Sequence, residues 1–207
     1  MSNMVITIGR QFGSGGREIG MELGKELGIK CYDKEIIKLA SKENGISEEI
    51  FEKVDEKPIN SFLYSIVANG FPAYYTPSHI NNALSDDKIF TMQADTIKKI
   101  ADEMPAIFIG RCADDILREN DKLIKIFIYS NKEYRKKTVC EKYQVSEKEA
   151  LEMMRRIDKS RSSYYEFFAS KKWGDVQNYD LCIDSSIGTS NVVEMIKKFI
   201  EIKGIKQ

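Results

Sequence analysis

Glycines and arginines gather near the start of the chain, in Met4–Gly20 (MVITIGRQFGSGGREIG). An apolar run leads into four closely spaced glycines, and apolar residues then recur at helical spacing. A strand, a glycine-rich turn and a new helix are typical of a phosphate-binding element, because the backbone folds around the anion and the helix N-terminus offers N–H groups and its dipole. The residues predicted to bind phosphate are Arg10, Gly13, Ser14, Gly15, Gly16 and Arg17.

This loop departs from the usual P-loop pattern, G-x-x-x-x-G-K-[ST], which places a lysine after the last glycine and then a hydroxyl for the metal. Here Gly16 is followed by Arg17 and Glu18, so the lysine is missing. We expect Arg17, one residue late, or Arg10, just before the loop, to reach the phosphates instead. The candidate metal ligands are Ser14, Asp33 and Asp114.

Further polar residues follow other predicted strands: Asp33, Arg111 with Asp114, and Arg135. Carboxyl ends of parallel strands share one edge of a sheet, so these side chains are expected near the glycine loop. Arginine clusters suit polyphosphates, since guanidinium offers a bidentate fork and stays charged. Asp33 could equally well be the ordinary start of a helix. For Arg111 the alternative to a functional role is a structural ion pair with Asp114 or Asp115.

A predicted long helix adds two arginines and then an acid with a third arginine. Asp158 and Arg161 are three residues apart and therefore share a helix face. For Arg155 and Arg156 a solvated helix face competes with phosphate binding. A capping box, Ser146-x-x-Glu149, predicts the start of this helix, and Ser130-x-x-Glu133 predicts the start of the preceding one.

The elements that must position these residues are short apolar strands separated by helices. The strands are expected at 4–8, 29–32, 106–110, 124–129 and 181–184. Unbroken apolar runs of this kind predict a parallel α/β sheet with helices on both faces. We expect a single domain over residues 1–207, a three-layer P-loop fold with a five-stranded sheet and a helical insertion at 34–105. The family resemblance given below implies that this insertion binds the acceptor and that residues from about 146 to 175 form a helical lid.

Composition excludes several classes of function. Lys plus Arg and Asp plus Glu both number 32, so the charge balance does not point to nucleic acid or an anionic membrane. No apolar run approaches the length of a membrane span, and we expect a cytoplasmic protein. The four cysteines show no C-x-x-C pairing and are expected as free thiols, and the single histidine, His79, excludes a multi-histidine metal site.

The chain resembles the cytidylate kinase-like branch of P-loop nucleoside monophosphate kinases over nearly its whole length. GRQFGSGGREIG is similar to the loop of that branch, which lacks the lysine, and Ile109-Gly110-Arg111 to the Gly-Arg at the third strand end. Ser130–Arg135 matches S-x-x-E-x-R, Asp158–Arg161 matches D-x-x-R, and Tyr179–Ser186 is similar to the last strand. Together, in the correct order and spacing, these motifs indicate the P-loop kinase fold.

The resemblance implies ATP-dependent phosphoryl transfer to a nucleoside monophosphate, CMP or dCMP, with Mg²⁺ bridging the donor phosphates. It implies acceptor binding by Asp33, Arg111, Asp158 and Arg161, and catalytic roles for Arg17, Arg156 and Arg161. The expected partners are nucleotide substrates, with a homodimer left open. Two alternatives remain: a P-loop kinase for another small acceptor, and a catalytically silent nucleotide-binding or sensing protein.

Overall fold

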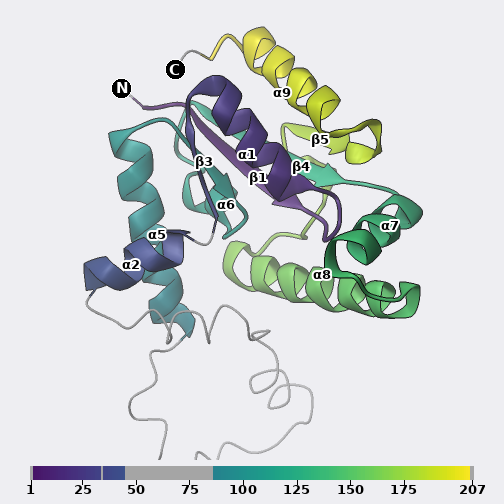
Figure 1. Cartoon of the computed structure of the whole chain (residues 1–207). Helices are drawn as coiled ribbons and strands as arrows, with labels where there is room; N and C mark the ends of the chain where they lie inside the picture. Colours follow the sequence, from purple (N-terminus) through teal and green to yellow (C-terminus); the bar gives the residue numbers. More distant parts are fainter. Residues whose placement is uncertain (1, 34, 45–85, 206–207) are drawn as a thin grey trace, which may run out of the picture. The chain divides into compact units, whose positions relative to one another are not determined.

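A parallel sheet forms the centre of the structure, a computed structural model that describes residues 2–33, 35–44 and 86–205. Its strands follow the order β2-β3-β1-β4-β5 (Figure 1). The bounds are β1 Val5–Arg10, β2 Lys30–Tyr32, β3 Ala106–Ile109, β4 Leu123–Tyr129 and β5 Leu181–Asp184. All four neighbouring pairs within this described sheet are parallel. The predicted five-stranded α/β sheet is confirmed.

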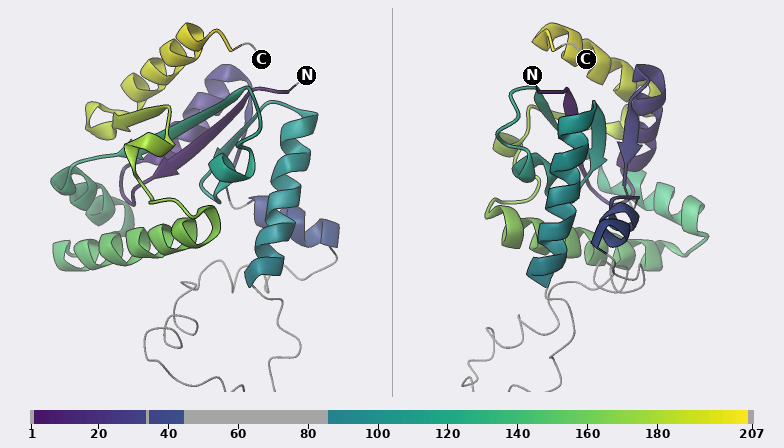
Figure 2. Two further views of the ribbon diagram at one scale, coloured as in Figure 1. Left: turned by 180° about the vertical axis from the view of Figure 1, so that it is seen from behind. Right: turned by 90° about the vertical axis from the view of Figure 1, so that its left-hand side faces the viewer.

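The chain divides into two compact units, Met1–Asp33 with Ile97–Gln207, and Lys34–Thr96. The first unit holds the sheet. Its helices are α1 Gly16–Leu27, α6 Ala113–Ile116, α7 Lys132–Tyr143, α8 Glu147–Ala169 and α9 Thr189–Lys203, with short 3₁₀ turns η1 Val176–Asn178 and η2 Ser185–Ile187. Helices α1 and α9 lie side by side on one face of the sheet, and α6 lies on the other (Figure 2).

Alternation along the strands decides which side chains face α1 and α9. Ile6 and Ile8 of β1 point to that side, together with every second residue of β3 and β4. Ile19 and Leu23 of α1 and Val192 and Ile196 of α9 close the layer from outside, all fully buried. Because side chains alternate along a strand, this core fixes which strand residues face the helices.

The second unit contains α2, Glu35–Asn44, and the first part of α5, Asp86–Glu103. The Thr96 hydroxyl of α5 lies 3.3 Å from Oε2 of Glu43 in α2 and 3.0 Å from the Met92 carbonyl oxygen, and it can donate to one of them at a time. Much of the expected acceptor-binding insertion, including the aromatic stretch 58–77 and His79, lies outside the described residues. Its role stays a prediction.

The helix starts confirm one predicted cap and correct another. Ser146 and Glu149 form the predicted capping box at the start of α8. At α7 the cap is Asn131, whose side chain accepts from the Tyr134 N–H at 2.9 Å, so the prediction of Ser130 as the cap was wrong. The Ser130 hydroxyl donates instead to Asp184 at the end of β5, because β4 and β5 are neighbours.

The four cysteines are free, as predicted. Among the described helices, none combines the length and the apolar character that a membrane span requires.

Candidate functional site

The glycine loop joins β1 to α1 and leaves the start of that helix open. Gly13 and Gly15 have φ values of 81° and 74°, which glycine adopts without the strain of a side chain. Gly15 is the N-cap residue and provides no side-chain hydrogen bond to the helix, and a Cβ atom there would meet nothing within 4 Å. An uncapped helix N-terminus beside open space is suited to a phosphate group.

Unlike the neighbouring glycines, Ser14 contacts the backbone of the loop and of β4 through its side chain. Its hydroxyl lies 2.9 Å from the Gln11 carbonyl oxygen and 3.2 Å from that of Ile128, and the residue is 1% exposed. A hydroxyl has one proton, so it donates to one of these carbonyls at a time. In this position Ser14 holds the loop against β4.

Arg10 leaves the end of β1 and passes close to two glycines. A Cβ atom on Gly16 would lie 2.5 Å from the Arg10 Cβ, and one on Gly110 would collide with the Arg10 guanidinium. Its Nη2 lies 3.9 Å from Oδ1 of Asp33, which follows β2. Since β3 lies between β1 and β2, Arg10 crosses the end of β3 to reach this acid. Gly16 and Gly110 leave room for that path.

Arg17, in the first turn of α1, also pairs with Asp33. Its Nε donates to Oδ2 of Asp33 at 2.8 Å. The Arg17 side chain is 54% exposed, whereas that of Asp33 is 10% exposed. One carboxylate thus lies between two guanidinium groups beside the open helix start.

The end of β3 has an unusual backbone. Gly110, Arg111 and Cys112 are all left-handed, with φ values of 71°, 63° and 53°. Each residue other than glycine costs about 1–2 kcal/mol in this conformation. Such strain is concentrated at functional sites, and here it directs the chain sharply from β3 into α6. Burial, reinforced by Asp114 and Asp115, raises the pKa of the Cys112 thiol and keeps it neutral.

Asp114 lies in α6 and is tied to the long helix α8. It accepts a 2.6 Å hydrogen bond from the Tyr165 hydroxyl. Burial raises the pKa of Asp114, and the Tyr165 bond acts against that rise. In the described ranges no three His, Cys, Asp or Glu side chains gather into a metal site. Asp33, which pairs with Arg10 and Arg17 next to the loop, stays a predicted ligand for a metal held mainly by phosphate oxygens.

Asp158 and Arg161 point from α8 onto the backbone of the glycine loop. Oδ1 of Asp158 accepts from the Phe12 N–H at 2.7 Å, and Oδ2 accepts from Nη1 of Arg135 at 2.6 Å. Nη1 of Arg161 donates to the Arg10 carbonyl at 3.1 Å. Burial lowers the pKa of Arg161, while Asp158 and Asp33 act against that shift. The structure brings this predicted pair to the loop.

Arg155 and Arg156 are placed differently from this pair. Both are exposed, and Arg156 is two positions from Asp158, so the two side chains do not share a helix face. The Arg156 guanidinium forms no ion pair or hydrogen bond with any residue that the structure describes. Its predicted role in neutralising the transferred group is not supported by a contact with the loop and stays a prediction.

Phe12 is a residue of the site that sequence reasoning missed. It packs with Val139 of α7 and with Ala150 and Met154 of α8. Its ring stacks on Tyr143 at a centroid distance of 5.5 Å, and the Arg161 guanidinium lies 5.7 Å from the ring centroid. A large aromatic residue inside a glycine-rich loop was the available signal, since such a side chain needs an apolar partner.

Three more polar groups join the ends of β1, β4 and β5. The Gln11 side chain accepts from the Ser130 N–H at 3.2 Å, and the Ser130 hydroxyl donates to Asp184 at 2.8 Å. The Ser186 N–H also donates to Asp184, and these bonds lower the pKa of that carboxyl. They hold the loop at the centre of the sheet edge.

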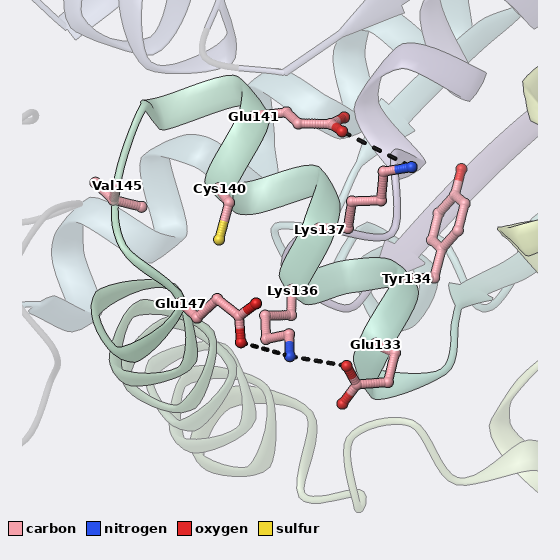
Figure 3. Close-up of a pocket in the computed structure, with 8 residues that line it drawn as sticks. All are labelled: Glu133, Tyr134, Lys136, Lys137, Cys140, Glu141, Val145 and Glu147. Atoms are coloured by element: carbon pink, nitrogen blue, oxygen red, sulfur yellow. Dashed lines mark hydrogen bonds and ion pairs between the residues drawn. The ribbon is translucent and has the colours of Figure 1, made fainter.

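A surface hollow beside α7 is bordered by the start of α8 (Figure 3). Lys136 lies between Glu133 and Glu147, with 2.8 Å to a carboxylate oxygen of each. The pairing with Glu147 joins α7 to α8. Two residues of its lining, Cys140 and Val145, pack against the apolar cluster that contains Phe12.

Comparisons with known proteins bear on the family and the fold. A model of the cytidylate kinase-like family matches residues 5–187. A crystal structure of an uncharacterized protein from Eubacterium ventriosum ATCC 27560 is 29% identical with a TM-score of 0.70, and the match covers 96% of this chain and 99% of that one. No curated protein sequence matches.

More distant solved structures are similar in fold. A shikimate kinase from Bacteroides thetaiotaomicron is 10% identical with a TM-score of 0.53, covering 96% of this chain and 98% of that one. A gluconokinase from Sinorhizobium meliloti 1021 is 13% identical with a TM-score of 0.50, covering 92% and 87%. At these identities the similarity shows the fold alone, which is that of P-loop kinases.

Proposed function

The chain belongs to the cytidylate kinase-like family, and from this premise we propose that it transfers a phosphoryl group from ATP to a nucleoside monophosphate, CMP or dCMP. The observation that carries the proposal is the glycine loop, with an uncapped helix start, open space over Gly15 and two arginines held by one acid. Phosphoryl transfer requires mainly positioning and charge stabilisation, and this arrangement supplies both.

Arg17 is the candidate for the role of the missing lysine. It follows the loop directly, its side chain is more than half exposed, and Asp33 holds its Nε. A guanidinium oriented in advance loses less conformational freedom when it binds a phosphate. The Arg10 side chain is largely buried and adds a second positive charge next to Asp33.

The acceptor phosphate is assigned to Arg111 at the end of β3. This position adjoins the end of β1, because the two strands are neighbours in the sheet. The strained backbone there supports the assignment, since strain of this kind persists at binding sites. Asp33, at the end of β2 beside the loop, would help to hold Mg²⁺, which would supply charge neutralisation for the transfer when bound.

The contacts of Asp158 and Arg161 favour a second candidate function. The resemblance places Asp158 and Arg161 on the pyrimidine nucleotide, yet both contact the loop backbone here. This observation favours, as the alternative, a kinase of the same architecture that phosphorylates another small acceptor.

The proposal is tested by measuring Mg·ATP turnover with CMP, dCMP, UMP, AMP and GMP, through ADP release and direct product detection. We expect turnover with a pyrimidine monophosphate. Arg17→Ala is expected to reduce kcat by roughly 100-fold or more, as for other removed electrostatic stabilisers. Lys25→Ala is the matched control, because Lys25 is an exposed base in the last turn of the same helix.

Turnover restricted to AMP or GMP would contradict the proposed acceptor. ATP binding without turnover on any of the five would contradict the nucleotide kinase and favour another acceptor or a sensing protein. Equal effects of Arg17→Ala and Lys25→Ala would show that Arg17 does not replace the lysine.

A further inference from the structure

Both carboxylate oxygens of Asp158 are engaged at the glycine loop. One accepts from the Phe12 N–H at 2.7 Å and the other from Arg135 at 2.6 Å. Hydrogen bonds to an ionised carboxylate at these distances are among the stronger ones in proteins. These two bonds direct the carboxylate at the backbone of the loop and at Arg135.

Arg135 completes a ring of contacts around one residue of the loop. The Nη1 atom that pairs with Asp158 also donates to the Phe12 carbonyl at 3.1 Å. The N–H and the C=O of Phe12 are therefore both held, one by the acid and one by the base. The Arg135 side chain is 12% exposed, so solvent screens this pair weakly.

Arg161 holds the loop two residues earlier, through the carbonyl of Arg10. The Phe12 ring adds an apolar contact, because it packs with Val139 and Met154. Helices α7 and α8 thus hold the loop by backbone and by side chain, on the side next to the open helix start.

From these contacts we infer that Asp158, with Arg135 and Arg161, is a positioning residue for the donor-phosphate loop rather than a ligand of the acceptor. The inference rests on the proposed function in taking this loop as the donor site. It places the D-x-x-R pair on Phe12 and Arg10 and leaves acceptor selection to other residues. The loop is then built by α8 as well as by its own glycines.

The first test uses protein without nucleotide and compares amide hydrogen exchange in peptides that contain Phe12. In Asp158→Asn the amide group would turn an N–H toward Arg135, which breaks the pair while preserving shape. We expect exchange at the loop to become about tenfold faster or more, since local opening no longer has to break these bonds. Glu152→Gln, an exposed acid-to-amide change on α8, is the matched control and is expected to leave the exchange unchanged.

The second test measures ATP affinity by calorimetry in the absence of any acceptor. A positioning role predicts about tenfold weaker ATP binding for Asp158→Asn, the effect of losing one charge-assisted bond. In turnover with the acceptor found above, the KM for ATP is expected to rise while that for the acceptor stays the same. Arg161→Gln removes a separate contact and is expected to act in the same direction, which covers the case that Asp158→Asn does not fold.

Unchanged exchange and unchanged ATP affinity, together with a raised acceptor KM, would overturn the inference and restore the acceptor role. If the wild-type protein bound no ATP, the proposed function would fail by itself. The exchange measurement would still decide whether Asp158 holds the loop.

Discussion

At the scale of single residues, the site depends on the path of Arg10. The side chain passes over Gly16 and beside Gly110 before it reaches Asp33. Two glycines are therefore explained by a neighbouring side chain and not by the phosphate alone. Arg17 meets the same acid from the other side, so each member of this cluster depends on the others for its place.

Gly16→Ala tests the path of Arg10. The new methyl group would lie 2.5 Å from the Arg10 Cβ, so either Arg10 or the start of α1 must move. We expect a loss of about 1–3 kcal/mol in the free energy of unfolding, typical of overpacking, and weaker ATP binding. Urea denaturation and calorimetry measure the two effects.

Gly28→Ala is the matched control at the other end of α1. It has a φ of 66° and nothing within 4 Å of the added Cβ, so only backbone strain is introduced. Its expected stability loss is about 1 kcal/mol, with ATP affinity unchanged. If Gly16→Ala behaved in the same way, Arg10 would not depend on Gly16.

At the scale of elements, α7 and α8 act as a pair that carries the loop. Val139 and Arg135 of α7 contact Phe12 or its neighbour Gly13, and Asp158 of α8 holds the same segment. The start of each helix is fixed by a local cap, Asn131 for α7 and Ser146 for α8. The position of the site residues on these helices follows from where the helices begin.

Asn131→Ala is expected to lower the free energy of unfolding by about 1 kcal/mol, because it removes the N-cap bond to Tyr134. Thermal or urea denaturation measures the loss. Lys132→Ala, an exposed neighbour in the first turn, is the control and is expected to stay within about 0.5 kcal/mol of the wild type. Equal stabilities for both variants would show that Asn131 is not the effective cap.

At the scale of the first unit, a chain of buried polar groups joins segments that are distant in sequence. The Tyr165 hydroxyl of α8 donates to Asp114 of α6, and Tyr179, just before β5, helps to raise the pKa of Tyr165. Burial raises the pKa of Asp114 and also those of both tyrosines. This chain links α6, α8 and the entry to β5.

The raised pKa of Asp114 predicts a pH dependence of stability with a definite sign. The folded protein binds this proton more tightly than the unfolded chain, so the contribution of Asp114 falls as pH rises from the ordinary value of about 3.9 through the raised pKa. Above that window the contribution is constant.

Asp114→Asn removes this titration and retains an oxygen acceptor for Tyr165. The free energy of unfolding of both proteins is measured by urea denaturation from about pH 4 to about pH 8. The value for the wild type minus that for the variant is expected to decrease as pH rises and then to become constant. A difference that grows with pH would contradict the raised pKa.

Local sequence patterns determined most of the secondary structure. The apolar run Leu181–Asp184 is β5 with the same bounds, and Ser146 with Glu149 starts α8. These features depend on residues only a few positions apart, so the hydrophobic period and the capping residues predict them from the sequence. The family motifs, in their order and spacing, also indicated the P-loop fold.

Contacts between distant segments were decided only by the tertiary structure. The sequence placed Arg10 and Arg17 near phosphate, but not on a shared Asp33. It paired Asp158 with Arg161 on one helix face, but not with the backbone of Phe12, which is 146 residues earlier. The Ser130 hydroxyl likewise bonds to Asp184 instead of capping α7. Each outcome depends on which strand ends are neighbours and how α8 packs on the loop, and residue spacing along one segment does not encode those partners.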